Sequence, residues 1–268
     1  MSEGSIQFLH CMKQREYLEK ALIEGLMFTV HRVMFSPFDS SSELERECEP
    51  VFDLMRRHLM GLGVASSEMR ETMRVLCHGI GNISMSIPMI CFTEVQHGRR
   101  IGQHGRSYGR FGLVVKRRWL ARQGADRVIY VGSSTPISKH LFHLLADKRI
   151  LSIHKAPNGT FNFSNAAMID AIRFASFIEQ SKNLEEAEWR IPGQFSFFGG
   201  TSWEGVKIPL PISEIEFVFV SQDSDIDPLR SVVRFLSSKQ GCTSPPPVIV
   251  FPDTIPSSPG ATEGPAAP

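Results

Sequence analysis

The chain has 268 residues, of which 42% are hydrophobic and 21% are charged, and its formal net charge at pH 7 is +1. These values are ordinary for a globular protein, and they exclude a chain that is drawn to nucleic acid or anionic membranes by its overall charge. No apolar run approaches the ~18 residues of a membrane span, and the N-terminus lacks a basic segment followed by an apolar core, so we expect neither a transmembrane helix nor a signal peptide.

The five cysteines are scattered and form no CxxC pair. This pattern is typical of unpaired thiols in a reducing compartment, and we expect a cytoplasmic protein. Cys91 lies inside the apolar run PMICF, where a thiol usually serves as a small buried hydrophobic group.

Apolar periodicity predicts alternating blocks of helix and strand. In chain order, the patterns predict a helix over about 10–30, a strand over 28–35, helices over 43–63 and 66–80, strands over 88–92, 111–115 and 128–131, helices over 136–151 and 165–182, strands over 188–191 and 215–220, and a helix over 227–239.

Helices that come first, followed by strands with interspersed helices, favour an α+β fold over a doubly wound one. We expect a mixed or mainly antiparallel sheet with flanking helices, in a single domain that covers residues 1–240. Residues 241–268 are dominated by Pro, Ser and Gly, a composition that predicts a disordered tail. The apolar VIVF segment within that tail is an alternative edge strand.

The stretch from Ile87 to Val131 carries the most functional information. Two apolar runs enclose a polar, glycine-rich segment with His97, His104 and Tyr108, an arrangement that often presents site residues on a rigid support. The same stretch is rich in basic residues, which form either a solvated face or a binding surface for an anion, a nucleic acid or a partner protein. The basic residues assigned to that surface are Arg99, Arg100, Arg106, Arg110 and Arg117.

The order of residues in this stretch resembles the AbiGi family of abortive phage-resistance proteins. The matching blocks are PMxCF followed by an acidic residue, then H-x3-YG-x-YG, then a helix with Trp, then a VxY strand. They are carried here by Pro88, Met89, Cys91, Phe92, Thr93, Glu94, His104, Tyr108, Gly109, Phe111, Gly112, Trp119, Gly124, Val128 and Tyr130.

The sequence departs mildly from the family pattern at two positions. Phe111 stands at the second tyrosine position of H-x3-YG-x-YG, where an aromatic residue is expected, and Glu94 stands where Asp is commoner. The resemblance implies an antitoxin of a two-gene phage-exclusion system, with a cognate toxin-like protein as its partner and no cofactor.

A second motif, Glu186-Ala-Glu188, precedes an apolar strand. Arg190 follows Glu188 by two positions, so both side chains share one face of the strand, as in a structural ion pair. The E-x-E pattern is also similar to that of ADP-ribosyltransferases, in which the second glutamate stabilises the oxocarbenium-like transition state. That resemblance implies an ADP-ribosyltransferase-like fold that handles NAD or another nucleotide.

In this alternative, the catalytic candidates are Glu188, Tyr108, His104 and Arg190. The candidates for holding the nucleotide are His31, on the first predicted strand, and Ser134, after the VIYV run. We expect no metal site, because His140 and His143 on one helix have no companion ligand at a suitable spacing. An enzyme requires the catalytic candidates to converge, whereas a binding protein does not.

Overall fold

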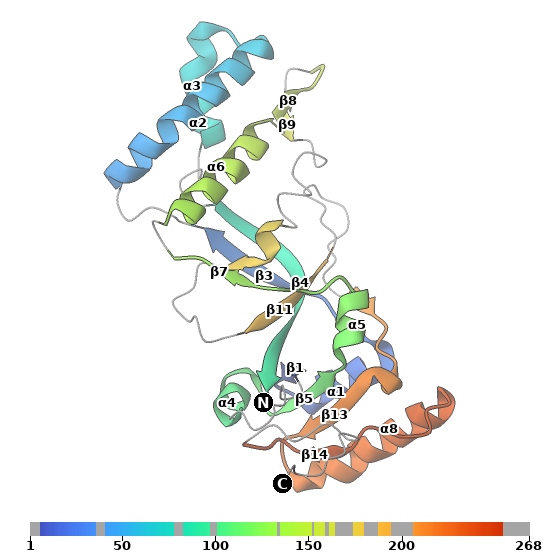
Figure 1. The fold of residues 1–268 in the computed structure, drawn as a ribbon. Helices are drawn as coiled ribbons and strands as arrows, with labels where there is room; N and C mark the ends of the chain where they lie inside the picture. Colours follow the sequence, from blue (N-terminus) through green and yellow to red (C-terminus); the bar gives the residue numbers. More distant parts are fainter. Residues whose placement is uncertain are drawn as a thin grey trace.

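The 14-residue strand β4 (Ile83–Gln96) runs through the centre of the computed structural model and connects its two halves (Figure 1). One half contains most of the sheet, and the other contains three long helices. The structure describes residues 6–35, 41–77, 83–96, 101–132, 135–151, 153–158, 161–163, 174–179, 187–193 and 206–253.

The main sheet is mixed and mostly antiparallel, which confirms the predicted α+β class. Its strand order is β14-β13-β5-β1-β4-β11-β6, and β3 also pairs with β4. All of these pairs are antiparallel except β13 with β14. Besides β4, the strands of this sheet are β1 (Ile6–Met12), β3 (Thr29–Phe35), β5 (Phe111–Val115), β6 (Asp126–Arg127), β11 (Glu188–Pro192), β13 (Ile215–Val220) and β14 (Val248–Val250).

Successive residues of the central strands enter two different cores, because both faces of the sheet are covered. Phe8 and Leu113 belong to a core on one face, and Leu9 and Val114 belong to a core on the other. The first core is covered by α1 (Arg15–Glu24), α5 (Arg117–Arg122) and α8 (Ile226–Lys239). The second core lies against the short helix α4 (Gly102–Tyr108).

The helical half contains α2 (Ser41–Gly61), α3 (Ser66–Cys77) and α6 (Pro136–Leu151), which lie together in Figure 1. Met55 and Leu59 of α2 and Phe142 of α6 pack in a third core with Ile87 from the first part of β4. The long strand therefore joins the cores of both halves. The small two-stranded sheets pair β7 (Ile129–Tyr130) with β10 (Ile178–Glu179), β2 (Leu26–Met27) with β12 (Lys207–Ile208), and β8 (Ile153–Lys155) with β9 (Phe161–Phe163).

The first predicted helix is only partly correct. It was expected to cover about 10–30, but α1 is limited to 15–24, between β1 and β2. The backbone of β1 is instead hydrogen-bonded between β4 and β5, and this long-range pairing overrides the local helical spacing.

The end of the helix expected over 165–182 is also different. Ile178–Glu179 forms strand β10, which pairs with β7, and residues 164–173 and 180–186 lie outside the described residues.

The boundary expected at Gly241 is corrected as well. Val248–Val250 forms the edge strand β14, parallel to β13, so the VIVF segment is an edge strand of the sheet and not part of a disordered tail. Val248 and Phe251 are buried, and this apolar burial holds a segment that its proline content alone would leave disordered. Residues 254–268 lie outside the described part of the chain. No helix in the described ranges is long and apolar enough to cross a membrane.

Candidate functional site

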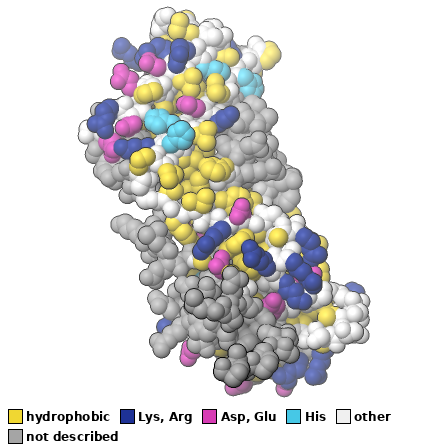
Figure 2. All heavy atoms as spheres, in the orientation of Figure 1, with side chains coloured by type: hydrophobic (Ala, Val, Ile, Leu, Met, Phe, Trp, Pro, Cys, Tyr) yellow, Lys and Arg dark blue, Asp and Glu magenta, His cyan; other side chains and the backbone are white. Residues whose placement is uncertain are grey.

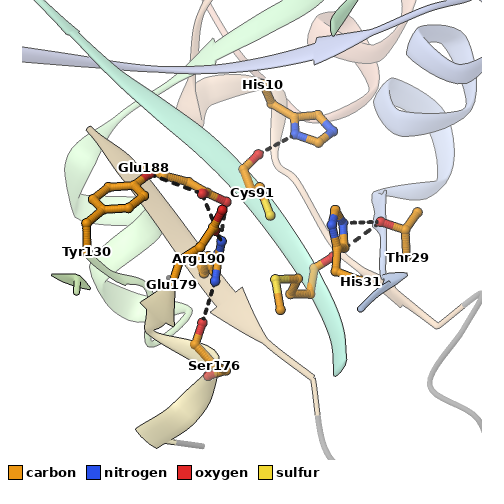
Figure 3. A network of polar contacts seen from close by, with 10 residues as sticks. His10, Thr29, His31, Cys91, Tyr130, Ser176, Glu179, Glu188 and Arg190 are labelled. Atoms are coloured by element: carbon orange, nitrogen blue, oxygen red, sulfur yellow. Dashed lines mark hydrogen bonds and ion pairs between the residues drawn. The ribbon is translucent and has the colours of Figure 1, made fainter. Parts of the chain in front are cut away.

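A buried guanidinium forms the centre of the candidate site. Arg190 on β11 is only 5% exposed, and hydrogen bonds of 2.9 Å run from its Nε and Nη2 atoms to the two carboxylate oxygens of Glu188. Its Nη1 atom donates to the carbonyl oxygen of Ser176 at 3.0 Å, and Nη2 also contacts the carboxylate of Glu179 (Figure 3). Every nitrogen of the guanidinium is therefore paired within the chain.

Strand geometry explains the arrangement. Glu188 and Arg190 are two residues apart on β11, so their side chains lie on the same face of the sheet. In the antiparallel pairing with β4, Thr93 lies opposite Glu188 and Cys91 lies opposite Arg190. Glu179 approaches from β10, whose partner strand β7 carries Tyr130, and the Tyr130 hydroxyl lies 3.5 Å from Glu188 Oε2.

The charges of this network compensate one another. Burial alone would lower the pKa of Arg190, but the hydrogen bonds and negative charge of Glu188, together with the charge of Glu179, raise that pKa above its ordinary value. Arg190 is thus a permanent cation between two carboxylates. Removing either the arginine or the carboxylates would leave an unpaired charge in a poorly solvated site.

The thiol of Cys91 is unsuited to nucleophilic chemistry. Burial raises the pKa of Cys91 well above its usual value, and the neighbouring Glu188 carboxylate raises it further by charge and by hydrogen bonding. The thiol therefore remains protonated at neutral pH, in agreement with the structural role expected from its apolar run.

His104 and Tyr108 lie one turn apart on α4. Their rings are in contact, with centroids 4.5 Å apart, and His104 Nε2 is 3.0 Å from the Thr93 hydroxyl. Because Thr93 lies opposite Glu188, His104 reaches the same sheet face as the Glu188 carboxylate. The structure thus brings the H-x3-Y motif and the E-x-E strand together through Thr93, although Tyr108 itself is 45% exposed.

Of the two residues suggested for holding a nucleotide, only His31 is described. His31 lies on β3, and its Nε2 atom is 2.9 Å from the Thr29 hydroxyl. Burial lowers the pKa of His31, and the positive charge of Arg190 lowers it further. Ser134 lies outside the described residues. No group of three potential metal ligands comes together in the parts of the chain that the structure describes.

The basic residues of the central stretch that the structure describes lie on different elements. Arg106 lies on α4 and Arg117 on α5, and these helices lie at opposite ends of β5 and against opposite faces of the sheet. Arg106, Arg110 and Arg117 are each exposed, whereas Arg99 and Arg100 lie outside the described residues. Arg106 and Arg117 therefore lie apart, and the binding surface expected from the basic residues stays a prediction.

Two α5 arginines have a structural role. Arg118 and Arg122 donate to the Glu214 carboxylate at 3.0 and 2.8 Å. Burial would raise the pKa of Glu214, but these hydrogen bonds and charges outweigh burial and lower it. Part of the basic cluster therefore fixes α5 to the chain just before β13 and is not available as a free positive surface.

Sequence reasoning missed four members of the site: Thr93, Tyr130, Ser176 and Glu179. Thr93 and Tyr130 were visible in the family-like blocks, but their side-chain roles depend on strand register. Ser176 and Glu179 were placed inside a predicted helix, so no signal linked them to Arg190.

Comparison with known proteins supports the resemblance noted in the sequence. No curated protein and no solved structure matches the chain. A family model does match, over residues 66–214, and it carries the description "Putative abortive phage resistance protein AbiGi, antitoxin". The match includes β4, α4, β5, α5, α6 and β11 and spans more than half of the chain. The chain therefore belongs to the AbiGi family of abortive phage-resistance antitoxins.

Proposed function

We propose that the chain is the antitoxin of a two-component phage-defence pair and that it acts by binding its cognate toxin protein. The observation that carries this proposal is the closed network around Arg190. All three guanidinium nitrogens and both Glu188 oxygens are engaged by groups of the chain itself. A site that chemistry could use would leave some of these groups for a substrate, whereas a binding scaffold can pair them all.

The charge distribution supports a protein partner more than a nucleic acid. A protein that tracks a phosphate backbone presents its cations along one surface. Here Arg106 and Arg117 lie on helices against opposite faces of the sheet, and Arg118 and Arg122 are paired with Glu214. The formal net charge of +1 adds no general attraction.

The proposal is tested by growth rescue. The gene of the candidate toxin is placed under one inducible promoter and the chain under another, in a bacterial host. Induction of the toxin alone should stop growth, and simultaneous expression of the chain should restore it through a stable complex. Growth arrest that persists at equal expression levels, with no complex recovered, would contradict the proposal.

One observation favours a second candidate, an enzyme that handles NAD or another nucleotide. His104 meets Thr93, which lies opposite Glu188, so these polar groups occupy one sheet face as a catalytic role would require. The variants Tyr108→Phe and His104→Gln separate the candidates, because both leave the Arg190 network intact. In the enzyme reading they abolish protection while toxin binding persists. In the antitoxin reading protection and binding change together.

A further inference from the structure

Helix α4, which carries His104 and Tyr108, has too few apolar residues to hold itself on the sheet. Its seven residues, GQHGRSY, include no aliphatic side chain, and Tyr108 at its end is 45% exposed. The helices of the helical half, by contrast, bring their own apolar residues to a core, and Figure 2 shows hydrophobic side chains, in yellow, over much of that half. Isolated helices shorter than about 12–15 residues are marginal in water. The conformation of α4 therefore depends on contacts made by other segments.

Two glycines make α4 weaker still as an isolated helix. Glycine inside a helix is less favourable than alanine, because it loses more backbone freedom on folding. Gly102 and Gly105 are nevertheless both buried. A Cβ at Gly102 would lie 2.7 Å from the Asp253 carboxylate, and one at Gly105 would lie 2.7 Å from the Phe251 ring. The two glycines thus lower the intrinsic stability of the helix and allow residues 251–253 to contact it closely.

Residues 251–253, which we call the C-terminal clasp, hold α4 by a backbone hydrogen bond and by apolar packing. The N–H group of Ile101, directly before α4, donates to the Asp253 carbonyl oxygen at 2.8 Å. Phe251 is 2% exposed and belongs with Ile101 to the core that lies against α4, where its ring meets that of Phe219 edge-on. This core is the smallest of the three among the described residues. Removing Phe251 would therefore take away a large share of what α4 packs against.

The clasp is itself attached to the sheet through an edge strand. Strand β14 has three residues and pairs with β13 on one side. At the two ends of this pairing, the Val218 N–H donates to the Pro247 carbonyl oxygen at 3.0 Å and the Phe251 N–H donates to the Val220 carbonyl oxygen at 2.8 Å. Short peripheral elements with few contacts open more readily than the centre of a sheet. We therefore expect residues 248–253 to open before the strands beside them.

The loss of the clasp would reach the candidate site through α4. His104 Nε2 is 3.0 Å from the Thr93 hydroxyl, and the His104 ring contacts Tyr108. Thr93 lies opposite Glu188 on β11. If α4 loses its helical conformation, His104 is no longer held at Thr93, and the polar groups of α4 separate from the sheet face that carries Glu188. Helix α4 thus connects the β14 edge of the sheet with its central strand (Figure 1).

We propose that the C-terminal clasp is a conformational switch for the candidate site. With residues 248–253 docked, α4 is helical and His104 contacts Thr93. With these residues undocked, α4 unfolds and the contact is lost, while the rest of the sheet stays folded. A ligand or partner that binds the assembled His104 and Tyr108 would shift the equilibrium toward the docked state. The switch concerns the site itself and does not depend on the antitoxin function proposed above.

Hydrogen exchange of the full-length protein, followed by mass spectrometry, tests the switch. In a series of urea concentrations below the unfolding transition, residues 101–108 and 248–253 should open together, and at lower urea than residues 215–220 of β13. The ring signal of His104 in NMR spectra should move toward its position in the unfolded protein over the same urea range.

The variant Val248→Ala tests whether the two segments are coupled. Val248 is buried in the core beneath α8, on the face of β14 away from α4. Its truncation should raise exchange in both segments by the same factor, roughly tenfold for the loss of two buried methyl groups. Val51→Ala on α2 is the matched control, since it removes the same groups from the core of the helical half. It should leave exchange in both segments unchanged.

The other outcomes overturn the switch. Exchange that rises over 248–253 but not over 101–108 in the Val248→Ala variant would show that α4 is held without the clasp. An equal rise in the Val51→Ala variant would show that the effect is a general loss of stability. If Val248→Ala unfolds the whole protein, the wild-type urea series decides. Separate opening transitions for the two segments contradict the coupling, and a shared transition supports it.

Discussion

The carboxylate of Glu188 and the guanidinium of Arg190 form a two-point contact, with both hydrogen bonds at 2.9 Å, between residues two positions apart on one strand. The pair is held from outside the strand by Glu179, Ser176 and Tyr130. Because β11 hydrogen-bonds to β4, the network ties β10 and β7 to the strand that runs through both halves. It is therefore a structural junction as well as a candidate site.

Replacing Arg190 with Leu should destabilise the protein strongly. The change leaves Glu188 and Glu179 without their cation, and breaking a buried pair on one side typically costs about 3–5 kcal/mol. Urea unfolding followed by circular dichroism measures this change. The double variant Arg190→Leu with Glu188→Gln should recover part of the lost free energy of unfolding, since it removes one of the unpaired carboxylate charges. Equal stability of wild type and single variant would show that the network is not a junction.

The thiols of Cys11 and Cys91 should resist alkylation in the folded protein. Burial raises the pKa of Cys11 to about 12 and that of Cys91 well above its usual value, so little thiolate is present at pH 8. Iodoacetamide labelling followed by mass spectrometry should modify both residues only after denaturation. Rapid labelling of Cys91 in native protein would argue for an activated thiol instead.

The same shifts predict loss of stability in alkali. A folded-state pKa above the unfolded value means that the unfolded chain releases the thiol proton first as pH rises. The contribution of the buried thiol to the free energy of unfolding is complete below the ordinary thiol pKa of about 8.5. For Cys11, this contribution declines as the pH rises from there toward 12. Cys11→Ala should therefore show a smaller drop in the free energy of unfolding between pH 8 and pH 10 than the wild type does.

His10 should make stability fall in acid. Burial lowers the pKa of His10, whose Nδ1 atom donates to the Cys91 carbonyl oxygen at 2.7 Å. The unfolded chain then binds the proton more readily than the folded protein does. The contribution of His10 to the free energy of unfolding is therefore complete above the ordinary histidine pKa of about 6.5 and is lost as pH falls below it. His10→Asn keeps a donor and removes the titration. The stability of this variant should depend less on pH between 7 and 5, and an identical dependence would contradict the assignment.

Truncation after Gly241 should lower the thermal midpoint by roughly 10 °C. The cut removes β14 and the buried side chains of Val248 and Phe251, each of which contributes about 1.5–3 kcal/mol. Truncation after Asp253 is the matched control and should leave the midpoint within a few degrees, because the removed residues are mostly Pro, Ser, Gly and Ala. Equal midpoints for the two truncations would mean that β14 contributes little.

Gly105→Ala should loosen α4, because an added Cβ would lie 2.7 Å from the ring of Phe251. Gly61→Ala is a suitable control, since no atom lies within 4 Å of its Cβ position. The first variant should raise hydrogen exchange over 101–108, and the second should leave exchange there unchanged. Similar exchange in both variants would show that Phe251 does not restrain α4.

The sequence predicted most elements whose apolar pattern is local, such as α6, β11 and α8. It failed where a distant segment decides the conformation. β1 has two adjacent buried apolar residues, Phe8 and Leu9, because both faces of the sheet are covered, so no simple alternation marks it as a strand. The α4 segment lacks an apolar stripe and is held by Phe251 and by the Asp253 carbonyl, both far away in the chain.

The same distinction applies to the site. The pairing of Glu188 with Arg190 follows from strand periodicity and was predicted correctly. The proximity of His104 to that strand face requires the register in which Thr93 lies opposite Glu188, and register over such a separation leaves no local signal. The separation of Arg106 from Arg117 likewise results from a chain crossing that charge patterning does not record.

Binding between the purified chain and the toxin proposed as its partner tests the antitoxin function directly. Size-exclusion chromatography with light scattering, followed by calorimetry, gives the composition and the dissociation constant of the complex. We expect a stoichiometric complex whose affinity is unchanged by Tyr108→Phe. Protection of cells without any complex, abolished by Tyr108→Phe, would contradict it and would favour an enzyme.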